Sequence, residues 1–127
     1  MAKVFEELEC WQLAADLDAK VYDLVINGKI NYSNSLKDQM LRSAGSIADN
    51  IAEGFERGGN KEFIQFLFIA KGSCGELRSR FHRSKRRGLI DEKVFEKFFN
   101  ECRTVSVKLS NLISYLKKSD FKGAKYT

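Results

Sequence analysis

Proline is absent from the 127-residue chain. Because proline interrupts helices and punctuates loops, its absence permits long uninterrupted helices throughout. Long apolar runs are lacking as well, and no stretch approaches the roughly 20 apolar residues that a transmembrane helix needs. The N-terminus turns acidic at Glu6 and Glu7 and lacks the apolar core of a signal peptide. We therefore expect residues 1–127 to form a single cytoplasmic domain.

Histidine and cysteine are scarce, which leaves few candidates for catalysis or metal binding. His82 is the only histidine, and because it lies in a basic run without an evident acid–base partner, we interpret it as a solvated surface residue. Cys10, Cys74 and Cys102 lie at or beside apolar positions, as expected of reduced, buried thiols. The chain has no CxxC pair. We expect no catalytic residue, no metal site and no cofactor.

Apolar residues recur with the period of an α-helix in four segments, and no segment alternates as a β-strand does. The inward positions are Trp11, Ala14, Leu17, Val21 and Leu24; Leu36, Met40, Ala44, Ile47, Ile51 and Phe55; Phe63, Phe66 or Leu67, Ala70, Cys74, Leu77 and Phe81; and Phe95, Phe98, Cys102, Val105, Leu109, Leu112 and Leu116. These patterns predict helices over about 9–26, 36–57, 61–87 and 92–118. Because short connections favour antiparallel neighbours, the predicted fold is all-α, an antiparallel up-down four-helix bundle. We expect the tail, residues 121–127, to be frayed.

Local capping residues predict where these helices begin and end. Ser35, with Asp38 three residues later, is the predicted N-cap of the second helix. Asn60 and Asp91 are the predicted N-caps of the third and fourth helices. Gly88 is placed to end the third helix in the left-handed conformation.

The third helix carries more apolar residues than one core-facing stripe needs. Ile64, Phe68 and Ile69 lie off the stripe given above. Because a bundle helix in a monomer keeps an outer polar face, we interpret these three residues as an oligomer interface. A wide, asymmetric core is the alternative.

Positive charge is concentrated near the end of the third helix, in residues 78–87, here called the basic segment. It holds six of the Lys/Arg residues and no acid: Arg78, Arg80, Arg83, Lys85, Arg86 and Arg87. The net charge is +5, so the rest of the chain sums to about −1. Six cations exceed what a helix C-terminus favours and repel one another. Neutralisation by phosphates explains them, so these six residues are the predicted nucleic-acid-binding site.

Residues 46–54 (Ser-Ile-Ala-Asp-Asn-Ile-Ala-Glu-Gly), 61–64 and 72–77 resemble a known bacterial family. It is the four-helix bundle family named after proteins encoded in intervening sequences of 23S ribosomal RNA genes. That family also includes the accessory variability protein of diversity-generating retroelements. The resemblance spans residues 5–118 and implies assembly into a homopentameric ring. For the retroelement branch it also implies a positive surface that binds nucleic acid and a reverse transcriptase. The chain departs from the family pattern at Ala48, where proline is common, and in its strongly basic third helix.

Asn50, Glu53 and Gly54 form the core of the family signature, and we interpret them as structural. Gly54 permits a tight helix approach or a bend. Asn50 and Glu53 are three residues apart on a helix, so they could bond each other or reach a partner helix or subunit. A recognition site is the alternative interpretation.

Together these observations predict a non-enzymatic, homo-oligomeric protein that contacts RNA or DNA through the basic segment. The sequence shows no base-reading motif, so recognition would use backbone charge and shape. One alternative is a protein–protein adaptor or scaffold, for example for a reverse transcriptase, with no direct nucleic-acid role. The other alternative is that the protein is an enzyme. We expect no membrane partner.

Overall fold

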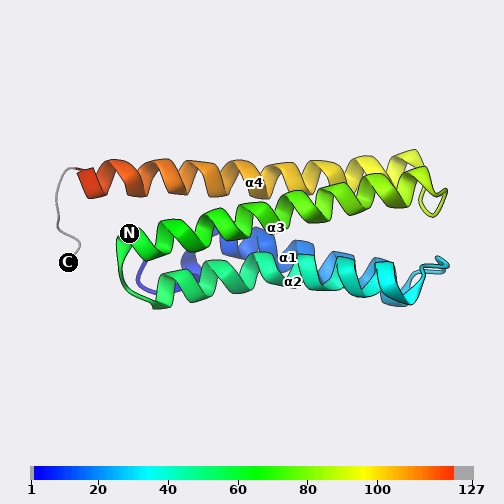
Figure 1. The fold of residues 1–127 in the computed structure, drawn as a ribbon, viewed down its shortest axis with the longest axis horizontal. Coiled ribbons are helices and arrows are strands. Elements are labelled where there is room, and N and C mark those ends of the chain that lie inside the picture. The colour runs from blue at the N-terminus through cyan, green and yellow to red at the C-terminus, as the bar shows by residue number, and fades with distance from the viewer. Residues whose placement is uncertain (1, 122–127) are drawn as a thin grey trace.

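The computed structural model describes residues 2–121, which contain helices and connections but no strand. The helices are η1 (3-10, Phe5–Glu7), α1 (Glu9–Tyr22), η2 (π, Asp23–Asn27), α2 (Asn34–Glu56), α3 (Asn60–Arg86) and α4 (Glu92–Phe121). The predicted all-α class with four long helices is confirmed, and successive long helices run in opposite directions (Figure 1). Fraying was predicted for residues 121–127, but Phe121 is still part of α4. Residues 122–127 lie outside the described part. No helix in residues 2–121 has the length and apolar character needed to cross a membrane.

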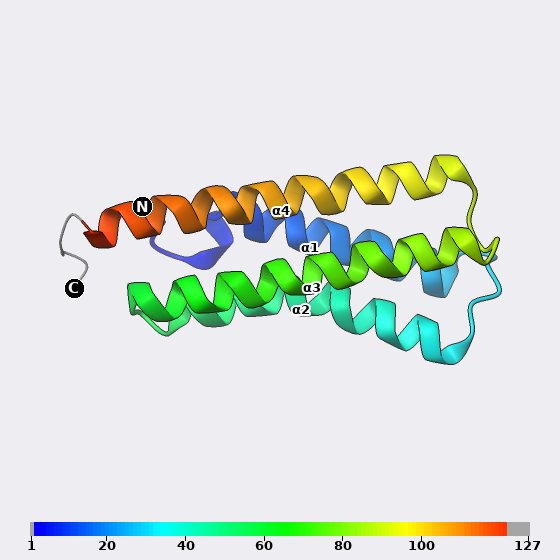
Figure 2. The ribbon, with the colours of Figure 1, turned by 45° about the horizontal axis from the view of Figure 1, so that its top comes forward.

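The helices pack so that α3 lies beside both α2 and α4, while α1 completes the bundle between α2 and α4 (Figure 2). The turn at residues 57–59 lies at one end of the bundle. The connections at residues 28–33 and 87–91 lie together at the opposite end (Figure 1). The basic segment therefore ends at the second of these ends, next to the first connection.

Two of the predicted helix ends are present. The Asp91 side chain accepts a hydrogen bond from the Val94 amide at 2.8 Å, so Asp91 caps α4. Gly88 has a φ of +74°, the left-handed conformation that ends a helix. The amide of Leu89 then donates to the Ser84 carbonyl at 2.9 Å, which completes the expected C-terminal motif of α3.

Two predicted N-caps were wrong. α2 is capped by Ser33 and not by Ser35, because the extended backbone that a cap requires occurs at Ser33. The Ser33 hydroxyl accepts a hydrogen bond from the Leu36 amide at 3.2 Å. Asn60 does not cap α3 either, since it is already helical. Its side-chain amide instead donates to the Leu116 carbonyl of α4 at 3.0 Å, which ties the start of α3 to the end of α4.

The predicted apolar stripes form the core, with a shift of one residue at two places. Val25 is buried where Leu24 was predicted, because the π-helix η2 adds residues to its turn and rotates the buried face. Ile113 is buried where Leu112 was predicted, since 3.6 residues per turn do not divide evenly into a heptad. Four predicted core residues are only partly buried: Trp11, Leu24, Phe55 and Leu112.

All three cysteines are buried and unpaired by disulfides, as the sequence predicts. Burial raises the pKa of the Cys10 thiol to about 11. The Cys74 thiol donates to the Cys102 carbonyl at 3.0 Å, between α3 and α4. All three cysteines lie in the apolar core, where they act as small core side chains.

Candidate nucleic-acid interface

The cations of the basic segment do not share one face of α3. Arg80 and Arg83 face α2, where both contact Gln39. Arg80 Nη1 donates to the Gln39 main-chain carbonyl at 3.2 Å, and Arg83 Nη1 donates to the Gln39 side-chain oxygen at 3.4 Å. Lys85 instead faces α4, where its Nζ lies 2.6 Å from Glu92 Oε1. The segment therefore presents two arginines to one neighbouring helix and neutralises a lysine against the other.

The remaining cations of the segment keep their charge available. Arg78 is partly buried. The hydrogen bond with Cys102 lowers the pKa of the Cys74 thiol, and the charge of Arg78 lowers it further. Arg86 and Arg87 are exposed at the end of α3. Within residues 2–119, no carboxylate lies within 4.0 Å of Arg78, Arg83, Arg86 or Arg87. Four of the six predicted binding residues are thus not neutralised by an ion pair in the described part of the subunit.

A groove between α2 and α3 extends the positive surface along the bundle. Its volume is about 280 Å³. Six polar residues line this α2–α3 groove: Gln39, Arg42, Ser43, Ser46, Glu76 and Arg80. Sequence reasoning missed Gln39 and Arg42 as site residues. Their spacing places them on one face of α2, but it does not reveal that this face lies opposite Arg80.

Charge in the groove is positive despite one acid. The Arg80 side chain is 22% exposed, and its Nη1 lies 4.0 Å from Glu76 Oε1, the longest ion pair in residues 2–119. Arg42 is exposed and has no carboxylate within 4.0 Å in that part of the chain. Two guanidinium groups thus stand against a single, largely exposed carboxylate.

The two halves of the chain differ in charge. Residues 1–59 contain 6 Lys/Arg and 10 Asp/Glu, whereas residues 60–127 contain 16 and 7. The corresponding net charges are −4 and +9. The half that forms α3 and α4 is therefore positive beyond the basic segment. The segment lies in a wider positive field.

The signature residue Asn50 connects two parts of the family motif across α2 and α3. Its side-chain amide donates to the carbonyl and to the hydroxyl of Ser46, both at 2.8 Å. The Ser46 hydroxyl lies 2.8 Å from that of Ser73. Asn50 therefore does not bond Glu53, one of the two expected arrangements, and its geometry serves helix pairing.

The other two signature residues also act on the contact between α2 and α3. A Cβ at Gly54 would lie 2.5 Å from the Cβ of Phe66, so only glycine fits this approach. Glu53 accepts a hydrogen bond from Arg57 at 3.0 Å, and Arg57 also lies 3.6 Å from Glu62 of α3. These contacts place Glu53 in an exposed ion-pair network at the turn between the two helices.

The three interface candidates on α3 differ in exposure. Phe68 and Ile69 are 48% and 52% exposed. Ile64 is partly buried and packs against the core. The nearby Gly72 has open space where a Cβ would stand. The outer face of α3 therefore offers two exposed apolar side chains beside a glycine.

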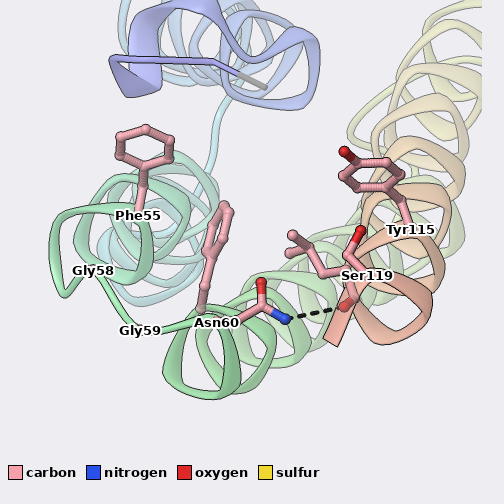
Figure 3. A pocket seen from close by; sticks show the side chains of 8 residues that line it. Phe55, Gly58, Gly59, Asn60, Tyr115 and Ser119 are labelled. Atoms are coloured by element: carbon pink, nitrogen blue, oxygen red, sulfur yellow. Dashed lines mark hydrogen bonds between the residues drawn. The ribbon is translucent and has the colours of Figure 1, made fainter. Parts of the chain in front are cut away.

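A separate apolar pocket of about 360 Å³ lies at the opposite end of the bundle (Figure 3). It is lined by Phe55, Gly58, Gly59, Asn60, Phe63, Tyr115, Leu116 and Ser119. Figure 3 shows the hydrogen bond from Asn60 to α4 that closes one side of it. Among the described residues, no charged side chain lines this pocket.

Comparison with known proteins adds two findings. A family model described as 23S rRNA-intervening sequence protein matches residues 6–111. The crystal structure of a protein with unknown function from the S23 ribosomal protein family of Bacteroides thetaiotaomicron VPI-5482 matches with a TM-score of 0.74. The two sequences are 22% identical, and the match covers 83% of this chain and 95% of the other. At that identity the likeness shows a shared fold. No curated protein matches this chain.

Proposed function

Because the chain belongs to the 23S rRNA-intervening sequence protein family, whose model matches residues 6–111, we propose that it is a non-enzymatic, oligomeric nucleic-acid-binding protein. The observation that carries this proposal is the cluster of arginines at the end of α3. Arg83, Arg86 and Arg87 are exposed, and no carboxylate of residues 2–119 lies within 4.0 Å of them.

Phosphates are the partner that such a cluster fits best. Clustered like charges destabilise the folded chain by mutual repulsion, and α3 keeps them at a helix end where one or two would satisfy the dipole. A nucleic-acid backbone removes this repulsion and releases condensed counterions at the same time. Binding of this kind depends on charge and shape and is independent of base sequence.

Self-association would multiply a weak single-site affinity. Phe68 and Ile69 are exposed on α3, and an apolar surface of this kind is typical of contacts between subunits. A homopentameric ring, as the family resemblance implies, would repeat the arginine cluster on every subunit. Simultaneous engagement of several clusters by one strand then raises the overall affinity without any new contact.

An adaptor that binds another protein is the second candidate. The observation that favours it is the same pair, Phe68 and Ile69, because phosphate binding gives no reason for exposed apolar side chains. A stable complex with a protein partner that survives nuclease treatment, combined with no nucleic-acid affinity at low salt, would support the adaptor and reject the first proposal.

The test is fluorescence anisotropy with labelled RNA and DNA oligonucleotides over a range of salt concentrations. The variant carries Arg83→Glu, Arg86→Glu and Arg87→Glu, and we expect it to lose binding. For the wild type, the slope of log affinity against log salt should steepen by about 0.9 for each phosphate contact on duplex DNA.

A matched control reverses three exposed cations of α4, with Lys93→Glu, Arg103→Glu and Lys118→Glu. This control has the same net charge as the first variant, so an effect of net charge alone would weaken oligonucleotide binding equally in both variants. Equal loss would contradict a local site at the end of α3. Circular dichroism should show unchanged helicity in both variants.

A further inference from the structure

The α2–α3 groove has the composition of an anion site and no other evident role. All six residues that line it are polar, and two of them are the arginines Arg42 and Arg80. Its volume is about 280 Å³. The groove therefore suits a small polar group and not a nucleobase, which would need an apolar or aromatic surface to stack on.

Gln39 of α2 positions Arg80 and Arg83 before any ligand binds. Gln39 accepts from Arg80 through its main-chain carbonyl and from Arg83 through its side chain. The Ser43 hydroxyl donates to the same carbonyl at 2.9 Å. Because the Arg80 guanidinium group is already held, it loses less side-chain entropy on binding an anion than a freely rotating arginine would.

Glu76 is the only acid among the described residues that line the groove, and its ion pair is weak. Its carboxylate is 4.0 Å from Arg80, and its side chain is 62% exposed. Exposed pairs at this spacing along a helix contribute little. A phosphate oxygen, by contrast, can accept paired hydrogen bonds from a guanidinium group. A phosphate therefore competes well with Glu76 for Arg80.

We propose that the α2–α3 groove binds one phosphate group between Arg42 and Arg80. Where that group belongs to a nucleic acid, this inference rests on the proposed function and extends it. The strand then crosses from the exposed arginines at the end of α3 onto α2. Free phosphate or a terminal phosphomonoester offers the same chemistry, so the experiment separates these sources.

The first measurement titrates the full chain with inorganic phosphate, against chloride at equal ionic strength, and follows amide NMR shifts. We expect saturable shifts at Ser43 and Ser46 that Arg42→Gln abolishes. The second measurement is oligonucleotide affinity. Loss of charge-assisted hydrogen bonds in Arg42→Gln should weaken binding by about tenfold. The control Arg103→Gln removes the same charge from α4 and should change affinity much less.

Glu76→Gln should increase the affinity for phosphate. A groove with only a structural role would show no such increase. Removing the competing carboxylate should tighten both phosphate and oligonucleotide binding by about threefold. Glu96→Gln, an exposed α4 residue with the same charge change, serves as the control. Oligonucleotides with and without a 5′-phosphate then identify the source, since equal binding indicates a backbone phosphodiester and dependence on the 5′-phosphate indicates a terminal group.

The outcomes separate this inference from the proposed function. If oligonucleotides bind but Arg42→Gln and Glu76→Gln behave like their controls, the groove site is refuted and the function stands. If oligonucleotides do not bind but phosphate shifts Ser43 and Ser46 in an Arg42-dependent manner, the function fails and the groove site is supported. If neither ligand binds, both fail.

Discussion

Replacing Gly54 with alanine tests the close contact between α2 and α3. The added Cβ would stand 2.5 Å from the Cβ of Phe66 and 3.1 Å from Cδ1 of Phe63. Carbon atoms in contact prefer roughly 3.5–4.0 Å, so the two helices must separate by about 1 Å at this point. Because the Phe66 Cβ is attached directly to the α3 backbone, no rotamer change relieves the clash.

The expected effect combines two opposing contributions. Overpacking a buried site typically costs about 1–3 kcal/mol, and a clash fixed to the backbone belongs to the upper part of that range. Alanine in place of glycine in a helix interior contributes about 1 kcal/mol of stabilisation. The net prediction is that Gly54→Ala destabilises the fold by about 1–2 kcal/mol.

Gly45→Ala on the same helix is the matched control. A Cβ at Gly45 meets only Asp18 Oδ1 at 3.8 Å, which is ordinary contact. This variant should gain up to about 1 kcal/mol, so the same substitution changes stability in opposite directions at two positions of α2. Urea unfolding followed by circular dichroism measures both at one fixed protein concentration, because assembly would contribute to stability.

Stabilisation of both variants to the same extent would refute the reasoning. That result would mean that α2 and α3 lie farther apart at Gly54 than the distances from Gly54 to Phe66 and Phe63 indicate. A destabilised Gly54→Ala variant beside a stabilised Gly45→Ala variant would instead locate the glycine requirement in the packing of α2 against α3.

Two further predictions concern electrostatics and assembly. Burial, together with the nearby Asp49, raises the pKa of the Asp18 carboxyl above its ordinary value of 3.8. The contribution of Asp18 to stability is therefore present at low pH and is lost as the pH rises through this raised pKa. Asp18→Asn should raise the melting temperature at pH 7, and the increase should become smaller as the pH falls towards 3.8. An increase that does not depend on pH would show that the charge of Asp18 is not its cause. If Phe68 and Ile69 form a subunit interface, replacing both with serine should reduce the mass measured by light scattering without loss of helicity, and an unchanged mass would place the interface elsewhere.

The long helices were predictable because their signals are local. The caps at Asp91 and Gly88 involve residues within a few positions of one another, and local sequence is enough to identify them. Apolar periodicity likewise depends only on 3.6 residues per turn. Ser33 escaped this reasoning because two other polar residues follow it directly, and the backbone conformation decided which one caps α2.

The candidate site divides in the same way. The basic segment is visible along the chain because its cations are consecutive or nearly so. The sequence does not show that these cations contact two different helices. Lys85 pairs with Glu92 across a turn, and Arg80 bonds Gln39, which is 41 residues away in the chain. Nor does the pattern reveal that Ile64 packs on the core while Phe68 and Ile69 face outward.

The sequence by itself determined the helical class, the approximate helix ranges and the excess of positive charge, because each depends on residues that are near neighbours in the chain. Tertiary structure alone decided that Asn50 and Ser46 meet Ser73, that Gly54 lies against Phe66, and that an α2–α3 groove exists. The physical reason is that these contacts arise from how α2 turns its face towards α3. That orientation follows from the packing of the whole core and not from any single segment.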